Sequence, residues 1–494
     1  MPRGPKPPFV GYRTARHGPR GAIRRRMAAA LSVGIGLGMG FGTGLAGCAS
    51  TRSAPTPAAE MPVEPGTYLP DFDRAWELVR DTFHEETYNG VDWEAVRVEL
   101  RPQAEAATTR AESRDIINGM VARLNQSHFG IIPEELQNAE TEIAASDDDG
   151  SETPAEVASD SEDGGVGFDV RVADERAVVT RVTPGGPADG AGVRPGWLLT
   201  AINGSEVAPL ITRFDESIGS RTGALYAWQS ITRGLNGPVG TQARLAFLDG
   251  ADRKVTRTVE RVEPDGQTVK FGNLPPIKVT FESRWLTPEE TGGGDARIGY
   301  IAFNSFMIAI TPDFERAMVA FKDADGVVID LRGNLGGVAP MCASLSRFFV
   351  SERSRIGTMK MRGQDLQFNA DPVVVTSGGE RLGPFTGPLA ILIDEGSAST
   401  AEFMAGGLRG LGRARTFGTR TAGMALPAAM SALPSGDVLL HAVADYVNSD
   451  GTRLESDGVG PDERVPVDRD ALLRGVDAPL RAAADWIAGA GTGA

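Results

Sequence analysis

Cysteine and histidine are both scarce in this sequence. It has 494 residues but only 2 cysteines, Cys48 and Cys342, which excludes a disulfide scaffold and a cysteine-rich zinc module. Any chemistry that depends on histidine must use one of only 4 such residues, His17, His84, His128 and His441.

An excess of basic residues is also absent. Lys+Arg number 50 against 65 Asp+Glu, a formal net charge of −15, which argues against a nucleic-acid partner. The hydrophobic share of 41% and the charged share of 23% are those of a folded, soluble protein. Length alone suggests about three domains.

The first 47 residues contain no acidic residue but carry eight of the basic ones. Three arginines at 24–26 precede an uncharged, glycine-rich stretch over residues 27–45, and the segment closes in Leu-Ala-Gly-Cys at Cys48. This order is typical of an export signal, and its ending resembles the lipobox of bacterial lipoproteins, in which the cysteine is lipidated. The alternative is a single membrane helix with an unrelated cysteine, which the many glycines disfavour.

The lipobox resemblance implies that residues 1–47 are removed and that the protein is held to a membrane, on the periplasmic side, through a lipidated Cys48. Removal leaves 42 basic against 65 acidic residues, a net charge of −23. Ala49 follows the cysteine where an aspartate retains many lipoproteins in the inner membrane, so we expect the outer membrane.

Two stretches of biased composition separate the predicted domains. Residues 49–65 are rich in Ser, Thr, Pro and Ala, which is typical of a flexible tether. Residues 140–163 hold ten acidic and no basic residues, and like-charge repulsion predicts a disordered linker there. A calcium site at the aspartates 147–149 is conceivable, but EF-hand spacing is absent. Between the two, apolar residues recur at helical spacing from Phe72 to Leu124, which predicts small amphipathic helices.

Residues 164–266 switch to short predicted strands separated by glycine-rich turns. A Gly-x-Gly-Phe loop before a strand can present backbone N–H groups to a carboxylate, while the strand edge pairs with an extended peptide. With its later turns, this segment closely resembles a PDZ domain of the kind that precedes bacterial protease domains. The resemblance implies that a protein C-terminus or an unstructured segment binds near Gly165, Val166, Gly167 and Phe168.

The last segment, residues 297–487, alternates apolar strands with helices and predicts an α/β layer. Two of its loops, 330–337 and 394–402, follow a strand and open a helix, where ligands of α/β sheets tend to bind. A serine at such a helix start lies beside free N–H groups and the positive end of the helix dipole, which stabilise a developing oxyanion. The hydroxyl residues of the second loop can equally be plain helix caps.

Four motifs in combination point to one family. They are Ser-Ala-Ser-Thr-Ala-Glu at 397–402, Asp-Leu-Arg-Gly-Asn-Leu-Gly-Gly at 330–337, Leu-x-x-Ser-His ending at His128, and Gly-Val-Gly-Pro-Asp at 458–462. The set resembles the C-terminal processing (tail-specific) serine peptidases and their relative tricorn.

The resemblance implies a multidomain α+β or α/β fold with a helical N-terminal cap, a PDZ-like β-rich domain and a ClpP/crotonase-like α/β peptidase core. By it, Ser399 is the nucleophile. The backbone N–H groups of Gly336 (or Gly337) and Thr400 form the oxyanion hole.

One position departs from the commonest pattern of the family. Most tail-specific proteases activate the serine with a lysine about 25 residues later, after Thr-x-Gly, but here Met424 follows that motif. A thioether cannot accept the proton. The tricorn branch uses a histidine that follows a serine and is held by a glutamate, which implies the arrangement Ser399, His128 and Glu455 as nucleophile, base and orienting group. An unperturbed pKa of ~6.5 suits histidine to this role.

The other candidates have more ordinary interpretations. We expect His84 on the solvated face of the first helix, beside Glu85 and Glu86. His441 lies in an apolar strand and is more readily a structural histidine, although it remains the alternative base. Cys342 lies in an apolar helix and reads as a core residue, not a thiol nucleophile.

The sequence therefore predicts an exported, lipid-anchored serine endopeptidase that acts on protein or peptide substrates with unstructured or C-terminal segments, without a cofactor or metal ion. The alternative is a catalytically inactive relative that binds peptides or hydrophobic ligands. The predicted segments are a signal peptide (1–47), tether (48–68), helical domain (69–137), acidic linker (138–163), PDZ-like domain (164–266), connector (267–296), peptidase core (297–487) and tail (488–494).

Overall fold

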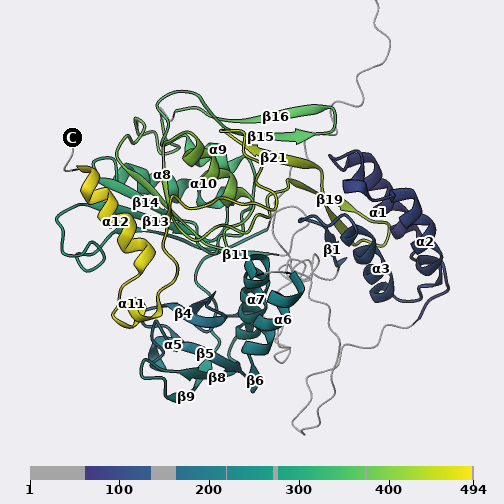
Figure 1. Cartoon of the computed structure of the whole chain (residues 1–494), viewed down its shortest axis with the longest axis horizontal. Helices are drawn as coiled ribbons and strands as arrows, with labels where there is room; N and C mark the ends of the chain where they lie inside the picture. Colours follow the sequence, from purple (N-terminus) through teal and green to yellow (C-terminus); the bar gives the residue numbers. More distant parts are fainter. Residues whose placement is uncertain (1–61, 135–162, 219, 271–275, 373–374, 492–494) are drawn as a thin grey trace, which may run out of the picture.

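The computed structural model describes residues 62–134, 163–218, 220–270, 276–372 and 375–491 (Figure 1). Cys48 with the predicted signal, and nearly all of the acidic linker, lie outside the described residues. Within the described ranges, no helix is both long and apolar enough to span a membrane.

Three helices form the N-terminal cap: α1 (Leu69–Thr82), α2 (Trp93–Ala106) and α3 (Arg110–Ala122). Asp92 caps α2, and Thr109 and Glu112 form a capping box at α3, so each start satisfies free backbone N–H groups. Their apolar faces pack on one cluster that also includes Leu439 of β20 (Val438–Ala442). The cap is therefore packed directly on the α/β core.

A small sheet continues this junction. β1 (Gly130–Ile132) pairs antiparallel with β20, which pairs on its other side with β19 (Ala428–Ala432). Because β1 begins two residues after His128, this pairing carries the end of the cap segment into the core.

The PDZ-like unit is a sheet of order β3-β4-β5-β8-β9, with β6 beside β5. Its strands are β3 (Phe168–Ala173), β4 (Arg176–Val182), β5 (Leu198–Ile202), β6 (Ser205–Glu206), β8 (Gln242–Leu248) and β9 (Lys254–Glu260).

Helices interrupt that unit where the sequence predicted only short strands. Besides the short α5 (Pro187–Gly190), it contains α6 (Ala208–Ile218) and α7 (Ser220–Leu235), which lie side by side next to the sheet and below the core in Figure 1. The buried residues Ala227, Ile231 and Leu235 recur every four residues, which suits a helix and not a strand. The sequence predicted the short strands of this segment but not the helices at 208–235.

The core sheet has the order β12-β13-β14-β17-β18-β22, with β12 antiparallel to β13 and every other pair parallel. The strands are β12 (Phe281–Trp285), β13 (Ile298–Phe303), β14 (Gly326–Asp330), β17 (Leu389–Ile393), β18 (Arg415–Gly418) and β22 (Glu463–Arg464). The apolar runs at 298–301, 327–329 and 389–393 are strands, as predicted.

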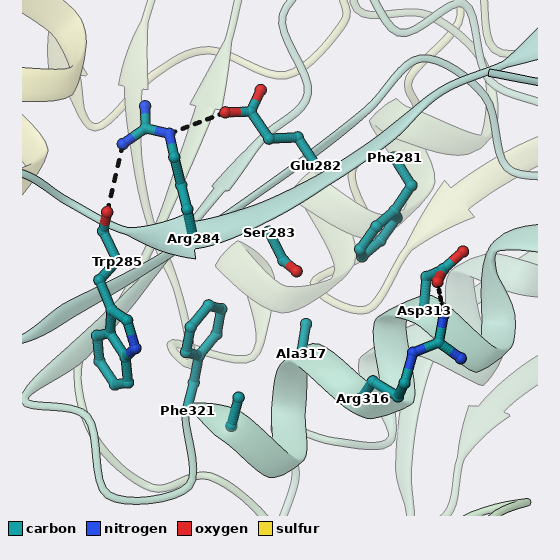
Figure 2. A pocket seen from close by; sticks show the side chains of 10 residues that line it. Phe281, Glu282, Ser283, Arg284, Trp285, Asp313, Arg316, Ala317 and Phe321 are labelled. Atoms are coloured by element: carbon teal, nitrogen blue, oxygen red, sulfur yellow. Dashed lines mark hydrogen bonds and ion pairs between the residues drawn. The ribbon is translucent and has the colours of Figure 1, made fainter. Parts of the chain in front are cut away.

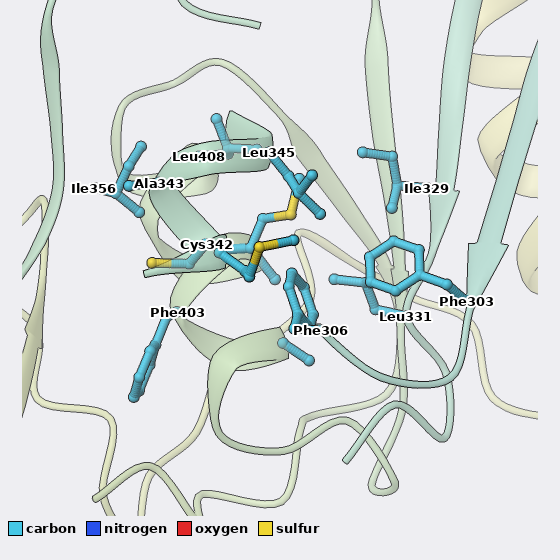
Figure 3. Close-up of a cluster of buried hydrophobic side chains, with 14 of the residues drawn as sticks. Phe303, Phe306, Ile329, Leu331, Cys342, Ala343, Leu345, Ile356, Phe403 and Leu408 are labelled. Atoms are coloured by element: carbon cyan, nitrogen blue, oxygen red, sulfur yellow. The ribbon is translucent and has the colours of Figure 1, made fainter. Parts of the chain in front are cut away.

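Helices cover both faces of this sheet. Ile329 packs with α8 (Thr311–Ala320), α9 (Met341–Ser346) and α10 (Thr400–Gly410), in the cluster drawn in Figure 3. Its neighbour Val328 points the other way, onto α12 (Ala478–Gly491). Burial on both faces explains why these strands are continuous apolar runs.

A second sheet of order β16-β15-β21 extends beside the core, with strands β15 (Ser354–Met361), β16 (Gln364–Ala370) and β21 (Ala444–Asn448). The remaining elements are short: β2 (Asp163–Gly164), β7 (Gly237–Pro238), β10 (Gln267–Val269), β11 (Ile277–Val279), η1 (Tyr88–Gly90), η2 (Ile308–Ile310) and α11 (Arg469–Leu473).

Candidate active site

Ser399 occupies a strained turn between β17 and α10. Its backbone has φ 54° and ψ −121°, in a region that a non-glycine residue rarely adopts, and it is 3% exposed. Its N–H donates to the Met424 carbonyl at 2.9 Å and to Glu402 Oε2 at 3.0 Å. A strand, a strained serine and a helix start in this order form a nucleophile elbow without the usual Gly-x-Ser-x-Gly sequence.

The Glu402 carboxylate ties this turn to the loop that contains Met424. Oε1 accepts hydrogen bonds from the Thr421 hydroxyl at 2.6 Å and the Gly423 N–H at 2.8 Å, and Oε2 accepts one from the Met424 N–H at 3.1 Å. Complete burial raises the pKa of Glu402 to about 7, although the donors act in the opposite direction. Sequence reasoning used Glu402 only as part of a motif, yet its place three residues after Ser399 is that of a capping box.

His128 lies between α3 and β1 with φ 62° and is 5% exposed. Its Nδ1 lies 2.7 Å from Ser127 Oγ, and the Ser127 hydroxyl donates to Glu455 Oε2 at 3.0 Å. A hydroxyl has one proton, so Ser127 must accept from an Nδ1–H, which assigns the tautomer. Nε2 then carries the lone pair, and it is buried with no hydrogen-bond partner. Burial lowers the pKa of His128 to about 4, which keeps the ring neutral near pH 7.

Glu455 reaches His128 through Ser127 and not directly. It accepts from the Ser127 N–H at 3.1 Å and from the Ala425 N–H at 2.8 Å, in addition to the Ser127 hydroxyl. Burial raises the pKa of Glu455, and these donors oppose the shift. Sequence reasoning used Ser127 only as the serine of the Leu-x-x-Ser-His motif that precedes His128 and gave it no role of its own.

Consecutive residues connect the two halves of the site. The Met424 carbonyl accepts from Ser399, and the next N–H, of Ala425, donates to Glu455. One hydrogen-bonded path thus runs from the turn of Ser399 through the 424–425 loop and Glu455 to Ser127 and His128.

The glycine loop 336–337 packs against this turn. Gly336 has φ +94°, and a Cβ built there would lie 2.7 Å from Ser399 Cβ, so only glycine fits. Its N–H donates to Asn334 Oδ1 at 2.9 Å. The Thr400 hydroxyl donates to the Gly337 carbonyl at 2.8 Å, which fixes the two loops together. Within the described part of the chain, the backbone N–H groups of Gly337 and Thr400 make no hydrogen bond.

The remaining histidines lie elsewhere. Both ring nitrogens of His441 have partners, with Nδ1 3.1 Å from Thr82 Oγ1 and Nε2 3.0 Å from Ser431 Oγ, so it is a structural residue at the cap–core junction. The solvated position expected for His84 was wrong: it follows the end of α1, is half-buried, and burial lowers its pKa. His84 lies beyond the C-cap residue Phe83, and its ring packs against the Phe83 ring with centroids 4.7 Å apart.

Cys342 and Met424 do not offer reactive groups. Cys342 is fully buried in α9, and burial raises the pKa of its thiol to about 12, as expected of a core residue. The Met424 side chain is buried in a small apolar cluster with Leu225, Ala398 and Ala422.

In the predicted peptide-binding loop of the PDZ-like unit, residues 165–168, one backbone N–H group already has a hydrogen-bond partner. The Gly165 N–H donates to the Val262 carbonyl at 2.8 Å, so this group is not free for a carboxylate. Gly167 has φ +77°, while Val166 and Phe168 point into the core of the unit. β3, which follows the loop, is an edge strand of its sheet.

A separate cavity of about 670 Å³ lies between β12 and α8 and is drawn in Figure 2. It is lined by residues such as Phe281, Trp285 and Ala317. None of the residues named around Ser399 and His128 lines it, so this cavity is separate from the candidate active site.

Comparison with known proteins agrees with this architecture. The model of "Peptidase family S41" matches residues 297–465, the "Tricorn protease C1 domain" matches 67–122, and the "PDZ domain" matches 156–212. The chloroplastic carboxyl-terminal-processing peptidase 2 of Arabidopsis thaliana is 26% identical over 406 residues, which are 80% of this chain and 68% of the relative. A carboxyl-terminal-processing protease of Picosynechococcus is 25% identical over 403 residues, 80% of this chain and 82% of the relative.

Two solved structures share the fold. The photosystem II D1 C-terminal processing protease matches with a TM-score of 0.51 and 24% identity, over 84% of this chain and 99% of that one. Mature CPAF complexed with lactacystin matches with a TM-score of 0.52 and 13% identity, over 86% and 97%.

The protein is a serine-type peptidase with a PDZ domain and a mixed helix-and-sheet fold. It carries the peptidase domain of family S41 and a tricorn-type C1 domain, and it is a homologue of the carboxyl-terminal-processing proteases.

Proposed function

We propose that Ser399 is the nucleophile of this peptidase and that His128 is its general base. The Ser399 hydroxyl oxygen attacks the scissile carbonyl carbon while its proton passes to His128 Nε2. His128 then gives this proton to the leaving amine, the C–N bond breaks, and an ester to Ser399 remains. Water hydrolyses the ester by the same steps, with His128 again as base.

The observation that carries this proposal is the lone pair of His128 Nε2. It is buried and without a partner, while the other ring nitrogen is bonded through Ser127 to Glu455. A general base needs this arrangement: a free acceptor, a neutral ring and a fixed tautomer. Glu455 and Ser127 are then the groups that orient the imidazole and stabilise the imidazolium.

The oxyanion hole in this proposal consists of the N–H groups of Thr400 and Gly337. Gly336, the other predicted donor, already gives its N–H to Asn334. Thr400 also lies at the first turn of α10, where the helix dipole favours negative charge.

Covalent labelling tests these assignments. A fluorophosphonate probe should label the wild-type chain at Ser399, as located by peptide mass spectrometry, and both Ser399→Ala and His128→Ala should lose the label. His84→Ala is the control, because its half-buried ring lies outside the site. Labelling of Ser399→Ala equal to that of the wild type would rule out Ser399 as the nucleophile. Labelling that survives in His128→Ala and is lost in a His441 variant would move the base to His441.

We further propose that the PDZ domain captures unstructured or C-terminal segments of protein substrates. The names of the relatives, carboxyl-terminal-processing proteases, and the edge position of β3 support this. A peptide with a free C-terminus should bind the full chain more tightly than its C-terminal amide in a fluorescence-polarisation assay. Equal affinities would exclude carboxylate recognition.

Export and lipid anchoring at Cys48 complete the proposal, with the enzyme on the periplasmic side of the outer membrane. The support is the basic, apolar and Leu-Ala-Gly-Cys order of residues 1–48. Metabolic labelling with a fatty-acid analogue should mark the wild-type protein and not Cys48→Ala, and the variant should leave the membrane fraction. Retention of the label in Cys48→Ala would contradict the anchor.

A further inference from the structure

An apolar cluster built from two domains adjoins the nucleophile. Leu225 of α7 packs in it with Ala398, Ala422 and Met424 of the core, and Leu335 lies against it. Leu225 is 1% exposed, so the core covers this side chain of the PDZ unit almost completely.

The core residues of this cluster belong to the loops that carry the proposed chemistry. Ala398 directly precedes Ser399, and the Met424 carbonyl accepts the Ser399 N–H. Leu335 directly precedes the glycine loop, where a Cβ at Gly336 would touch Ser399. The space that Leu225 fills therefore lies beside the nucleophile and the oxyanion donors.

A substrate must place a side chain in this position. Ser399 attacks the carbonyl carbon of the substrate residue on the acyl side of the scissile bond. The side chain of that residue is attached to the neighbouring Cα, so it must lie among the residues next to Ser399. Hydrophobic side chains of the core meet there, and two of them are alanines, which leave room for a side chain from elsewhere. A charged side chain placed among these apolar groups would lose its water.

We propose that Leu225 occupies the enzyme's acyl-side specificity subsite, that Met424, Ala422 and Leu335 line this subsite, and that it takes an aliphatic substrate residue about the size of leucine. The inference rests on the proposed role of Ser399. Met424 then contributes to substrate selection and not to proton transfer.

α7 is held in this place by contacts of two residues that follow Leu225. Three residues later, the Trp228 ring lies 4.8 Å from the guanidinium of Arg171 on β3, and Arg171 Nε donates to Asp394 Oδ2 of the core at 2.7 Å. The next residue after Leu225, Tyr226, is close enough to Glu455 that the carboxylate charge adds to burial in raising its pKa. Substrate and α7 cannot share this space, so the described arrangement is the closed one, and α7 must withdraw for catalysis.

Cleavage specificity tests the subsite. The full chain is assayed with internally quenched peptides that differ only in the acyl-side residue, Leu, Ala, Phe, Lys or Asp. We expect kcat/KM for Leu to exceed that for Asp and Lys by at least about tenfold. Ala422→Leu, which fills the subsite, should lower the Leu-to-Ala ratio of kcat/KM by about tenfold, and Met424→Ala, which enlarges it, should raise the Phe-to-Leu ratio. These ratios cancel any loss of folded enzyme.

The rate of fluorophosphonate labelling tests whether Leu225 occupies the subsite. Leu225→Ala should increase the rate of fluorophosphonate labelling of Ser399, because the subsite is then open. Leu210→Ala is the matched control, since it removes the same atoms from α6 within the PDZ cluster, away from Ser399.

The outcomes separate the two proposals. Absence of labelling in the wild type and in every variant would overturn the role of Ser399 itself. Labelling that depends on Ser399, together with specificity ratios unchanged in Ala422→Leu and Met424→Ala, would overturn the subsite while leaving the nucleophile in place. Equal labelling rates for Leu225→Ala and Leu210→Ala would show that Leu225 does not occupy it.

Discussion

Ser127 shows how one small side chain can set the chemistry of its neighbour. Its single proton goes to Glu455, so its oxygen must accept from His128 Nδ1, and the lone pair of His128 is left on Nε2. Without the hydroxyl, Nδ1 would have no partner and either tautomer would be available. Ser127 is thus a positioning residue for His128.

Ser127→Ala should lower kcat by about 10²–10⁴-fold with a smaller effect on KM, because the wrong tautomer cannot accept the proton of Ser399. The matched control is Ser431→Ala, which removes a hydroxyl bonded to a buried histidine outside the site, His441. Steady-state kinetics on one peptide measure both variants. A Ser127→Ala enzyme as active as Ser431→Ala would remove Ser127 from the mechanism.

Buried ionisable residues also make stability depend on pH. Burial lowers the pKa of His441 to about 4, below the ordinary value of ~6.5, so the unfolded chain binds the proton first as pH falls. The stability present above pH ~6.5 is lost progressively as pH falls toward 4, by up to about 3 kcal/mol for this fully buried group. Glu402, whose pKa burial raises to about 7, acts oppositely: the folded state loses stability as pH rises from ~4.5 through 7.

Urea unfolding of the wild type and His441→Asn between pH 7 and pH 4.5 isolates the contribution of His441 to the pH dependence of the unfolding free energy. At pH 7 the variant should be less stable than the wild type, because bonds to Thr82 and Ser431 are weakened. The difference should shrink on acidification, since only the wild type must keep a buried imidazole neutral. A difference in unfolding free energy that stays constant across this range would contradict the assignment.

Among the secondary-structure elements, those with strong local patterns were predictable. The run 389–393 is continuously apolar because both faces of β17 are covered, and the Ser-x-x-Glu spacing places a helix start at Ser399. The α6–α7 pair was missed because the surrounding glycine-rich turns favoured strands, while its helical spacing spans only a few buried residues. The partner of Leu225 lies about 170–200 residues away in the sequence and cannot be read from local pattern.

α11 connects the C-terminal part of the core to the PDZ unit. Arg469 donates to the Gly196 carbonyl at 2.9 Å and to the Asp249 carbonyl at 2.8 Å, and the Leu473 side chain packs on Gly196. Gly196 has φ +84°, and a Cβ there would lie 2.7 Å from Leu473 Cγ. In Figure 1, α11 and α7 lie on opposite sides of the PDZ unit.

Gly196→Ala should therefore destabilise the protein by more than Gly192→Ala. Both glycines have positive φ, +84° and +79°, so each alanine carries backbone strain of about 1–2 kcal/mol, but nothing lies within 4 Å of a Cβ at Gly192. The clash with Leu473 should add about 1–3 kcal/mol. Thermal unfolding measures the difference, and adding Leu473→Ala to Gly196→Ala should recover part of it. Equal losses in the two single variants would show that the α11 contact is not tight.

At the scale of the whole molecule, the site forms where the cap segment packs on the core, and the PDZ unit closes against it. The cap segment supplies Ser127 and His128, the core supplies Ser399 and Glu455, and Leu225 of the PDZ unit packs against the core loops beside Ser399. Motifs in the sequence indicated Ser399, His128 and Glu455 one by one. The bridge through Ser127 spans 328 residues, and the Asn334 bond that occupies Gly336 is a detail of loop geometry, so neither could be predicted from the sequence.

The central claim is that His128 is the base that activates Ser399, and the pH dependence of single-turnover acylation tests it most directly. With a rapid-quench assay on a peptide ester, the acylation rate constant of the wild type should be level from pH 8 to about pH 6.5. It should fall only below that range, because burial lowers the pKa of His128 to about 4. The rate constant of His128→Ala should be at least about 10³-fold lower throughout. A wild-type rate constant that still rises through pH 9, or one that His128→Ala leaves unchanged, would contradict the account.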